Sequence, residues 1–130
     1  MFTSVEKDCS LPIPAERIVQ QQLDAYNRRD LEAWLATYAP DAKQYLLHGG
    51  PLAVGVDAIR ARMRDRFADP ALHAELVGRT VMDNIVVDHE YVTRTSPGGL
   101  ERIEMICIYD VHAGLIRKAT FAMGQARAKT

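Results

Sequence analysis

The sequence predicts an α+β fold, in which three helices precede an antiparallel sheet and pack against one of its faces. Apolar residues recur at helical spacing in three segments before residue 70. Four long segments with the alternating pattern of strands follow, separated by turn residues at hairpin spacing. Helices that come before a run of hairpin-linked strands favour a curved sheet with the helices on one side.

Length and composition are those of one soluble domain, preceded by a flexible arm over residues 1–13 and occupying residues 14–130. The 130 residues are 48% hydrophobic and 25% charged, so a core can form without disulfides. A net charge of −1 argues against nucleic acid or an anionic membrane as a partner. Because no leader peptide or apolar run of about 18 residues is present, we expect a cytoplasmic protein.

The three predicted helices each have a recognisable start or stop. Pro14 precedes the first, Asp30 caps the second, which ends before Pro40, and Asp57 caps the third. The apolar positions at helical spacing are Ile18, Val19, Leu23 and Tyr26; Leu31, Trp34, Leu35 and Tyr38; and Ile59, Met63 and Phe67. Gln22 lies within the apolar arc of the first helix rather than on its polar side.

A short strand is predicted over residues 43–47, and long strands over residues 72–82, 85–95, 101–111 and 115–123. Alternation decides which side chains face the helices, and in each strand the more apolar set is assigned inward. The inward sets are Ile85, Val87, His89 and Tyr91; Ile103, Met105, Cys107, Tyr109 and Val111; and Ala119, Phe121 and Met123.

Two histidines are candidates for proton transfer because imidazole titrates near neutral pH. His89, on the inward face, is either a general base in a cavity or a buried, neutral, hydrogen-bonded histidine. His48 follows the first strand beside two glycines and either lines the mouth of a cavity or lies outside it.

Two charged clusters are given structural interpretations. Asp88 and Glu90 share the outward face of their strand and could share an ion, but a solvated or interface face is favoured, so no metal and no cofactor are expected. On the third helix, Arg60 and Arg64 lie on one side and Arg62 and Arg66 on another. These arginines form no single basic stripe for nucleic acid, and they indicate a solvated helix surface.

The stretch AYNRRDLEAWLATYAPDA, followed by GVDAIRARM and a meander that ends in GLIRKATF, resembles the nuclear-transport-factor-2-like (NTF2-like) superfamily, in its ketosteroid-isomerase and SnoaL-like polyketide cyclase branch. The resemblance covers the chain from about Pro14 to Met123. It implies a cystatin-like roll, a cone in which a curved antiparallel sheet wraps around three N-terminal helices and leaves an apolar pocket at one end. It also implies a homodimer through the outer sheet face, where Ile106 and Ile108 point outward.

The isomerases of this family use one carboxylate base with a tyrosine and a protonated carboxylic acid. At the matching positions this sequence has Leu46 for the base, Gln22 for the tyrosine and Met105 for the second acid. The resemblance therefore implies the pocket but not the familiar steroid isomerisation mechanism.

A pocket for a small hydrophobic molecule with a carbonyl or hydroxyl group is predicted. Its expected lining is Gln22, Tyr26, Trp34, Tyr45, Leu46, Met63, Phe67, His89, Met105, Tyr109, Ala119 and Phe121. Gln22 is either a polar group for the ligand or a core glutamine bonded to the backbone. Three functions stay open: an isomerase, cyclase, dehydratase or hydrolase that uses His89 or His48, a non-catalytic binding protein, and a homodimeric association module.

Overall fold

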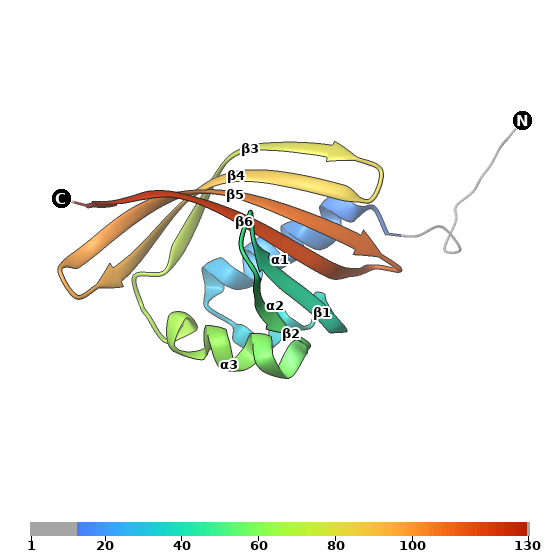
Figure 1. Cartoon of the computed structure of the whole chain (residues 1–130), viewed down its shortest axis with the longest axis horizontal. Coiled ribbons are helices and arrows are strands. Elements are labelled where there is room, and N and C mark those ends of the chain that lie inside the picture. Colours follow the sequence, from blue (N-terminus) through green and yellow to red (C-terminus); the bar gives the residue numbers. More distant parts are fainter. Residues whose placement is uncertain (1–12, 130) are drawn as a thin grey trace, which may run out of the picture.

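The computed structural model describes residues 13–129, so the expected arm over residues 1–13 lies outside the described residues apart from Ile13. Two helices come first, two strands and a third helix follow, and four long strands come last (Figure 1). The helices are α1 (Ala15–Arg28), α2 (Leu31–Leu35) and α3 (Val56–Phe67). The strands are β1 (Tyr38–Leu46), β2 (Pro51–Val54), β3 (His73–Met82), β4 (Ile85–Ser96), β5 (Gly99–His112) and β6 (Leu115–Ala128).

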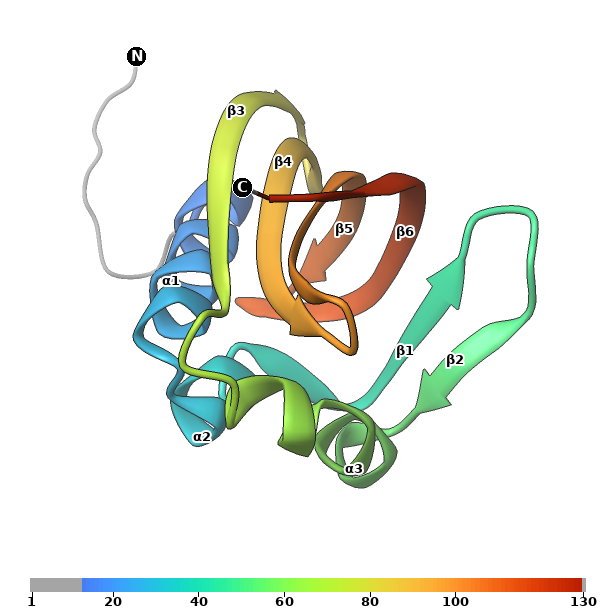
Figure 2. The ribbon, with the colours of Figure 1, turned by 90° about the vertical axis from the view of Figure 1, so that its left-hand side faces the viewer.

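The strands form one curved, open sheet in the order β2-β1-β6-β5-β4-β3. Every neighbouring pair is antiparallel except β1 and β6, which are parallel. Figure 2 shows that the long strands curve and that α1, α2 and α3 lie on one side of them. The predicted α+β architecture is confirmed.

The ends of the helices follow from local residues, with one difference from prediction. The Asp30 carboxylate accepts a hydrogen bond from Ala33 N at 3.1 Å and caps α2 as expected. In contrast, α3 begins at Val56 after Gly55, and Asp57 lies in its first turn, where its charge still favours the helix dipole. No helix within residues 13–129 has the length and apolar character needed to cross a membrane.

The second helix is shorter than predicted, because the chain leaves it at Leu35 and enters β1 at Tyr38. Pro40 therefore lies in a strand rather than after a helix. It falls in the stretch between Tyr38 and Lys43 where the pairing of β1 with β6 is irregular. A residue without an N–H group is tolerated there, since no ladder hydrogen bond is lost. The short strand β2 was not predicted.

The inward face predicted for β4 is wrong. Val86, Asp88, Glu90 and Val92 are buried, and the alternate residues, which include His89, are only half-buried. The reason is the tight turn between β4 and β5, which pairs Ser96 with Gly99 and so places Glu90 directly opposite Met105. Residues directly opposite in an antiparallel pair point to the same face.

The inward faces of β5 and β6 agree with prediction for most positions. Ile103, Cys107, Tyr109 and Val111 are buried in β5, as are Ala119 and Phe121 in β6, whereas Met105 is half-buried and Met123 is 40% exposed. The buried side chains of both strands share one hydrophobic core with the aromatic residues Trp34 of α2, Tyr38 of β1 and Phe67 of α3. The Trp34 ring lies 4.7 Å from that of Tyr38 and 5.2 Å from that of Phe67, centroid to centroid. The core is therefore aromatic on the helix side and mixed on the sheet side.

Candidate functional site

A cavity of about 70 Å³ lies between the inner face of the sheet and the three helices. It is bordered by α1, α2, α3, β1 and β3 to β6. Its lining residues are Gln22, Leu23, Tyr26, Trp34, Tyr38, Gln44, Arg62, Met63, Arg66, Ala74, Glu90, Val92, Arg94, Met105, Cys107, Tyr109, Phe121 and Met123. Three of these are methionines, whose unbranched side chains adapt readily to a neighbour of changed shape.

A second, wider hollow of about 740 Å³ lies over strands β3 to β6 and the end of the chain. Its lining is mostly charged or polar: His73, Glu75, Tyr91, Thr93, Arg102, Glu104, Gln125, Arg127, Ala128 and Lys129. The smaller cavity is the better candidate for a ligand site, because it combines apolar walls with a buried titratable group.

Seven of the twelve residues predicted to line a pocket border the cavity: Gln22, Tyr26, Trp34, Met63, Met105, Tyr109 and Phe121. The other five do not. Phe67 and Ala119 are buried in the core beside it. Tyr45 stacks under the Lys118 ammonium, 5.3 Å from the ring centroid, and Leu46 is 37% exposed near the end of β1. His89 is the fifth.

Neither candidate histidine faces the cavity. His89 points to the outer face of the sheet, where its Nε2 lies 2.6 Å from Oε2 of Glu104. The prediction that His89 faces inward is wrong, because the buried face of β4 is the opposite one. His48 is exposed in the turn after β1, with φ of 62°. Their use as proton-transfer groups in this cavity therefore lacks a geometric basis.

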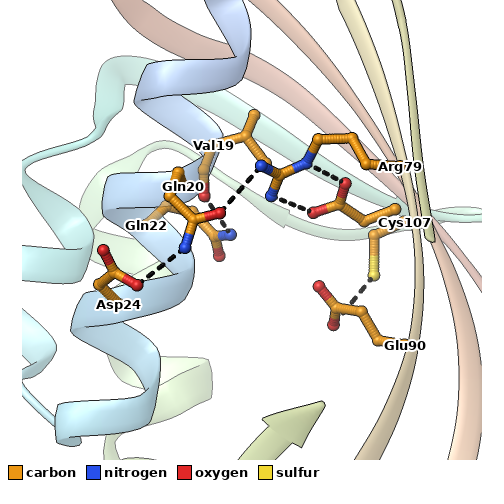
Figure 3. A network of polar contacts seen from close by, with 8 residues as sticks. Val19, Gln20, Gln22, Asp24, Arg79, Glu90 and Cys107 are labelled. Carbon is orange, nitrogen blue, oxygen red and sulfur yellow. Dashed lines mark hydrogen bonds and ion pairs between the residues drawn. The ribbon is translucent and has the colours of Figure 1, made fainter. Parts of the chain in front are cut away.

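Glu90 is the acidic group that the cavity contains. Its side chain comes from β4, it is 5% exposed, and its Oε1 accepts a hydrogen bond from the Cys107 thiol at 3.8 Å (Figure 3). Burial, with a further contribution from the negative charge of Asp88, raises the pKa of Glu90 to about 7. A carboxyl group in this state is half protonated near neutral pH and can either take up or release a proton.

Asp88 lies two residues before Glu90 on the same face but has a strong partner. Arg79 Nε donates to Asp88 Oδ1 at 2.7 Å and its second nitrogen donates to Oδ2 at 2.9 Å. The third guanidinium nitrogen donates to Gln20 on α1 at 2.9 Å, and Gln20 in turn donates to Asp24 (Figure 3). Arg79 thus gives the fully buried Asp88 a donor for each of its oxygens and, through Gln20, ties α1 to the sheet. The two acids on one face thus have different environments and different chemistry.

Three tyrosines line the cavity beside Glu90. Burial raises the pKa of Tyr26, Tyr38 and Tyr109 well above the usual value, and a negative charge on Glu90 adds to each of these shifts. All three hydroxyl groups therefore stay protonated and are available as donors. Tyr38 Oη is buried and has no hydrogen-bond partner in the described part of the chain. It is the donor most available to a bound oxygen atom.

The cavity glutamines differ in how fully they are used. Gln22 donates to Val19 O at 3.1 Å and accepts from Trp34 Nε1 at 2.8 Å. Gln22 is thus bonded both to the backbone and to the cavity tryptophan. Gln44 accepts from Arg62 at 2.8 Å, while its Nε2 has no partner among residues 13–129. A buried amide N–H without a partner is a place where a ligand oxygen can gain a hydrogen bond.

The structure separates the four arginines of α3, which were interpreted as one solvated surface. Arg60 pairs with Glu32 and Asp57, and Arg64 is exposed. Arg62 and Arg66 instead border the cavity together with Arg94 of β4. Their spacing of four residues places Arg62 and Arg66 on one side of the helix. That spacing was visible in the sequence, but the position of the helix against the cavity was not.

Sequence reasoning missed the polar half of the site. Glu90 was assigned outward, and Tyr38 was assigned to a helix. The signal for Glu90 was the pair Pro97-Gly98, which forms a two-residue turn and fixes the register of β4 against β5. Among residues 13–129, no three histidine, cysteine, aspartate or glutamate side chains lie together in a way that could hold a metal ion. The chemistry available here is that of a buried acid, phenols, amides and guanidinium groups.

Solved structures with similar folds come from several bacteria. An uncharacterized cystatin-fold protein of Novosphingobium aromaticivorans superposes with a TM-score of 0.76 at 21% identity, covering 84% of this chain and 97% of that one. A Mycobacterium tuberculosis protein in complex with estradiol-17β-hemisuccinate has a TM-score of 0.71 at 20% identity, covering 83% and 92%. A protein of Catenulispora acidiphila with a ketosteroid isomerase-like fold, in complex with trimethylamine, has a TM-score of 0.69 at 14% identity, covering 80% and 82%. At these identities the likeness concerns the fold.

No curated protein sequence matches the chain. The SnoaL-like domain family matches residues 19–119, which run from the first helix into the last strand and include most of the cavity lining. The match agrees with the helix, strand and sheet order described above and with the expected superfamily. The chain belongs to the SnoaL-like domain family of the NTF2-like superfamily.

Proposed function

We propose that the cavity binds a small, largely hydrophobic carbonyl compound and that Glu90 moves a proton on it, in a reaction of the isomerase, cyclase or dehydratase type. The observation that carries this proposal is a buried carboxyl group, with a pKa of about 7, that borders a cavity between the sheet and the helices. General acid–base catalysis is most effective when the pKa of the catalytic group is near the working pH.

The tyrosines supply the second requirement of such a reaction. Removing a proton next to a carbonyl group places negative charge on its oxygen, and a hydrogen-bond donor near that oxygen stabilises the charge. The Tyr38 hydroxyl is buried without a partner in the described part of the chain, and Gln44 Nε2 is a second donor of this kind. In this proposal Glu90 acts as the base and Tyr38 donates to the developing oxyanion, with different residues from those of the ketosteroid isomerases.

The comparisons support a small-molecule role at the level of the fold. One structural neighbour holds estradiol-17β-hemisuccinate and another holds trimethylamine. A third, from Streptomyces galilaeus, is described as a putative hydroxylase. Estradiol-17β-hemisuccinate and trimethylamine differ widely in size and charge, so the ligand of this chain has to be inferred from its own residues.

A thermal-shift screen tests the proposal directly. The panel holds steroid enones, polyketide fragments and terpenoid epoxides, each with a carbonyl or epoxide oxygen that a buried donor can bind. A ligand at about 100 times its dissociation constant is expected to stabilise the folded state by about 2.7 kcal/mol, which raises the melting temperature measurably. Each hit is then incubated with the protein and analysed for product by mass spectrometry and NMR.

The two readouts separate the enzyme from a non-catalytic binding protein. If Glu90 acts as the base, we expect a hit in the screen. We also expect the ligand to exchange the carbon-bound proton next to its carbonyl group with solvent deuterium. Binding without exchange or turnover above background favours the binding protein. A folded protein that gives no hit across the panel contradicts the proposed ligand class.

We also propose a homodimer through the outer face of the sheet. Ile106 and Ile108 are half-buried on that face of β5, beside Val87 of β4 and Ala122 of β6, and the helices lie on the opposite side (Figure 2). Light scattering at tens of micromolar is expected to give twice the chain mass. Changing Ile106→Asp together with Ile108→Asp should give the monomer mass, whereas Val77→Asp, at an exposed position of β3, should not. A wild-type monomer at that concentration would rule out the interface.

A further inference from the structure

We propose that Arg62 and Arg66 form a binding site for the anionic group of the ligand, so that the cavity takes a small apolar molecule bearing a carboxylate. This inference rests on the proposed function and names the ligand class within it. Guanidinium groups hold carboxylates in a planar, bidentate arrangement with two charge-assisted hydrogen bonds.

The two side chains are placed together at the border of the cavity. Arg62 and Arg66 lie one turn apart on α3 and both line it, as does Met63 between them. Arg62 donates to Gln44 Oε1 at 2.8 Å, which holds one guanidinium nitrogen toward the cavity interior. Arg66 is half-buried there, and no hydrogen bond from its guanidinium is found within residues 13–129. Several N–H groups of the two guanidinium groups are therefore available to donate hydrogen bonds to a ligand.

In contrast to their neighbours, these two arginines form no ion pair with an acidic residue of the described chain. Arg94, the third arginine of the cavity, donates to Glu101 at 2.6 Å, and Arg60 on the same helix pairs with Glu32 at 3.0 Å. Among the described residues no carboxylate lies within 4.0 Å of the guanidinium of Arg62 or Arg66. Arg62 is exposed and Arg66 is half-buried, and their positive charges repel one another. An anion bound between the two guanidinium groups removes that repulsion.

The arginines and Glu90 act on different parts of the cavity. Glu90 enters the lining from β4, on the sheet side of the cavity. Arg62 and Arg66 enter it from α3, on the helix side. A ligand carboxylate at the arginines therefore leaves its apolar body to extend toward Glu90. An amphipathic acid satisfies both ends, whereas a neutral hydrocarbon leaves the arginines unpaired.

The test compares phenylacetate with phenylacetamide, which have the same shape and differ in charge. Binding is measured by calorimetry at about pH 6, where Glu90, with its pKa of about 7, is mostly protonated and does not repel the anion. Phenylacetate is expected to bind about tenfold tighter than the amide, an advantage that shrinks with added salt because both arginines are partly exposed. The amide serves as the measure of cavity binding without the anionic group.

Variants assign the preference to particular side chains. Arg62→Gln together with Arg66→Gln is expected to abolish the preference for phenylacetate while the amide binds as before. Arg66→Lys keeps the positive charge but loses the two parallel N–H donors of the guanidinium group, so it should retain part of the preference. The matched control is Arg64→Gln, which removes one charge from the exposed side of the same helix and should leave the preference unchanged. Unchanged amide binding shows that each variant remains folded.

The outcomes distinguish this inference from the proposed function. A preference lost in the double variant and kept in Arg64→Gln supports the anion site. Equal binding of the two probes, or a preference that the double variant retains, overturns the anion site and leaves the cavity as a binding site for neutral compounds. Failure of both probes alongside a positive hit in the carbonyl panel also overturns the anion site alone. Failure of both probes and of the panel overturns both proposals.

Discussion

Replacing Glu90 by glutamine is expected to stabilise the folded protein above neutral pH and to remove proton transfer at the same time. Glutamine has nearly the same shape but carries no charge at any pH. Loss of a general acid or base lowers turnover by about 10²- to 10⁴-fold. For any compound that the wild-type protein converts, the variant should therefore bind it but convert it at no more than about one hundredth of the rate.

The stability effect follows from the direction of the pKa shift. The pKa of Glu90 is about 7 in the folded protein and 4.5 ordinarily, so between these values the folded state holds more protons than the unfolded state. The free energy of unfolding of the wild type therefore falls as the pH rises from about 4.5 through about 7, by about 3 kcal/mol from this group. Glu90→Gln lacks this fall, so the difference between the two proteins grows across that window.

Urea unfolding of both proteins at about pH 5 and about pH 8 measures this difference. The two unfolding free energies should be close at the lower pH and differ by about 3 kcal/mol at the higher pH, in favour of the variant. Glu75→Gln on β3, an exposed glutamate, should show no such divergence. Parallel pH profiles of wild type and Glu90→Gln would mean that Glu90 is not a buried acid.

Replacing Arg79 by methionine is expected to destabilise the folded protein by about 3–5 kcal/mol, more than any other substitution proposed for this chain. Asp88 is fully buried and its two oxygens accept from Arg79 at 2.7 and 2.9 Å. Methionine keeps much of the length of the side chain and removes both donors. The cost arises because a buried carboxylate is left without its partner, and because α1 loses the hydrogen bond from Arg79 to Gln20.

Two further variants make this result specific. Arg117→Met removes a guanidinium 3.9 Å from Asp41 in an exposed pair and should cost less than about 1 kcal/mol. Arg79→Met combined with Asp88→Val removes both buried charges and should recover part of the loss, since replacing a whole buried pair by apolar residues is often tolerated. Chemical denaturation measures all three. If the double variant is no more stable than Arg79→Met alone, the unpaired charge is not the cause.

The sequence was sufficient to predict the fold but not the polar half of the cavity. Helical spacing and turn residues mark α1, α3 and the four long strands to within a few residues. In β4, however, the rule that the more apolar set faces inward selected Ile85, Val87, His89 and Tyr91. The rule failed because a buried aspartate is compensated by an arginine on the next strand, and such compensation is not visible in the pattern of a single strand.

Pairing between strands carried the information that the single strand lacked. Met105, Cys107 and Tyr109 were assigned inward, and a two-residue turn at Pro97-Gly98 places β4 residues of even number opposite β5 residues of odd number. Together these require Glu90 to face inward. Tyr38 was assigned to a helix for another reason. Its spacing from Trp34 continues the helical pattern, but α2 ends at Leu35, before Tyr38 is reached. Tertiary packing, rather than periodicity, decided where that helix stops.

The three methionines of the cavity bear on how a protein of this kind diverges. Met63, Met105 and Met123 come from α3, β5 and β6, so unbranched thioether chains contribute to the wall from three separate elements. Rotation about their bonds can reshape the space without moving the backbone. New ligand preferences are therefore within reach of single substitutions at these positions, while Glu90 and the arginines stay in place. Under the proposed function, substitutions at these positions would change the preferred ligand while the acid that moves the proton is kept.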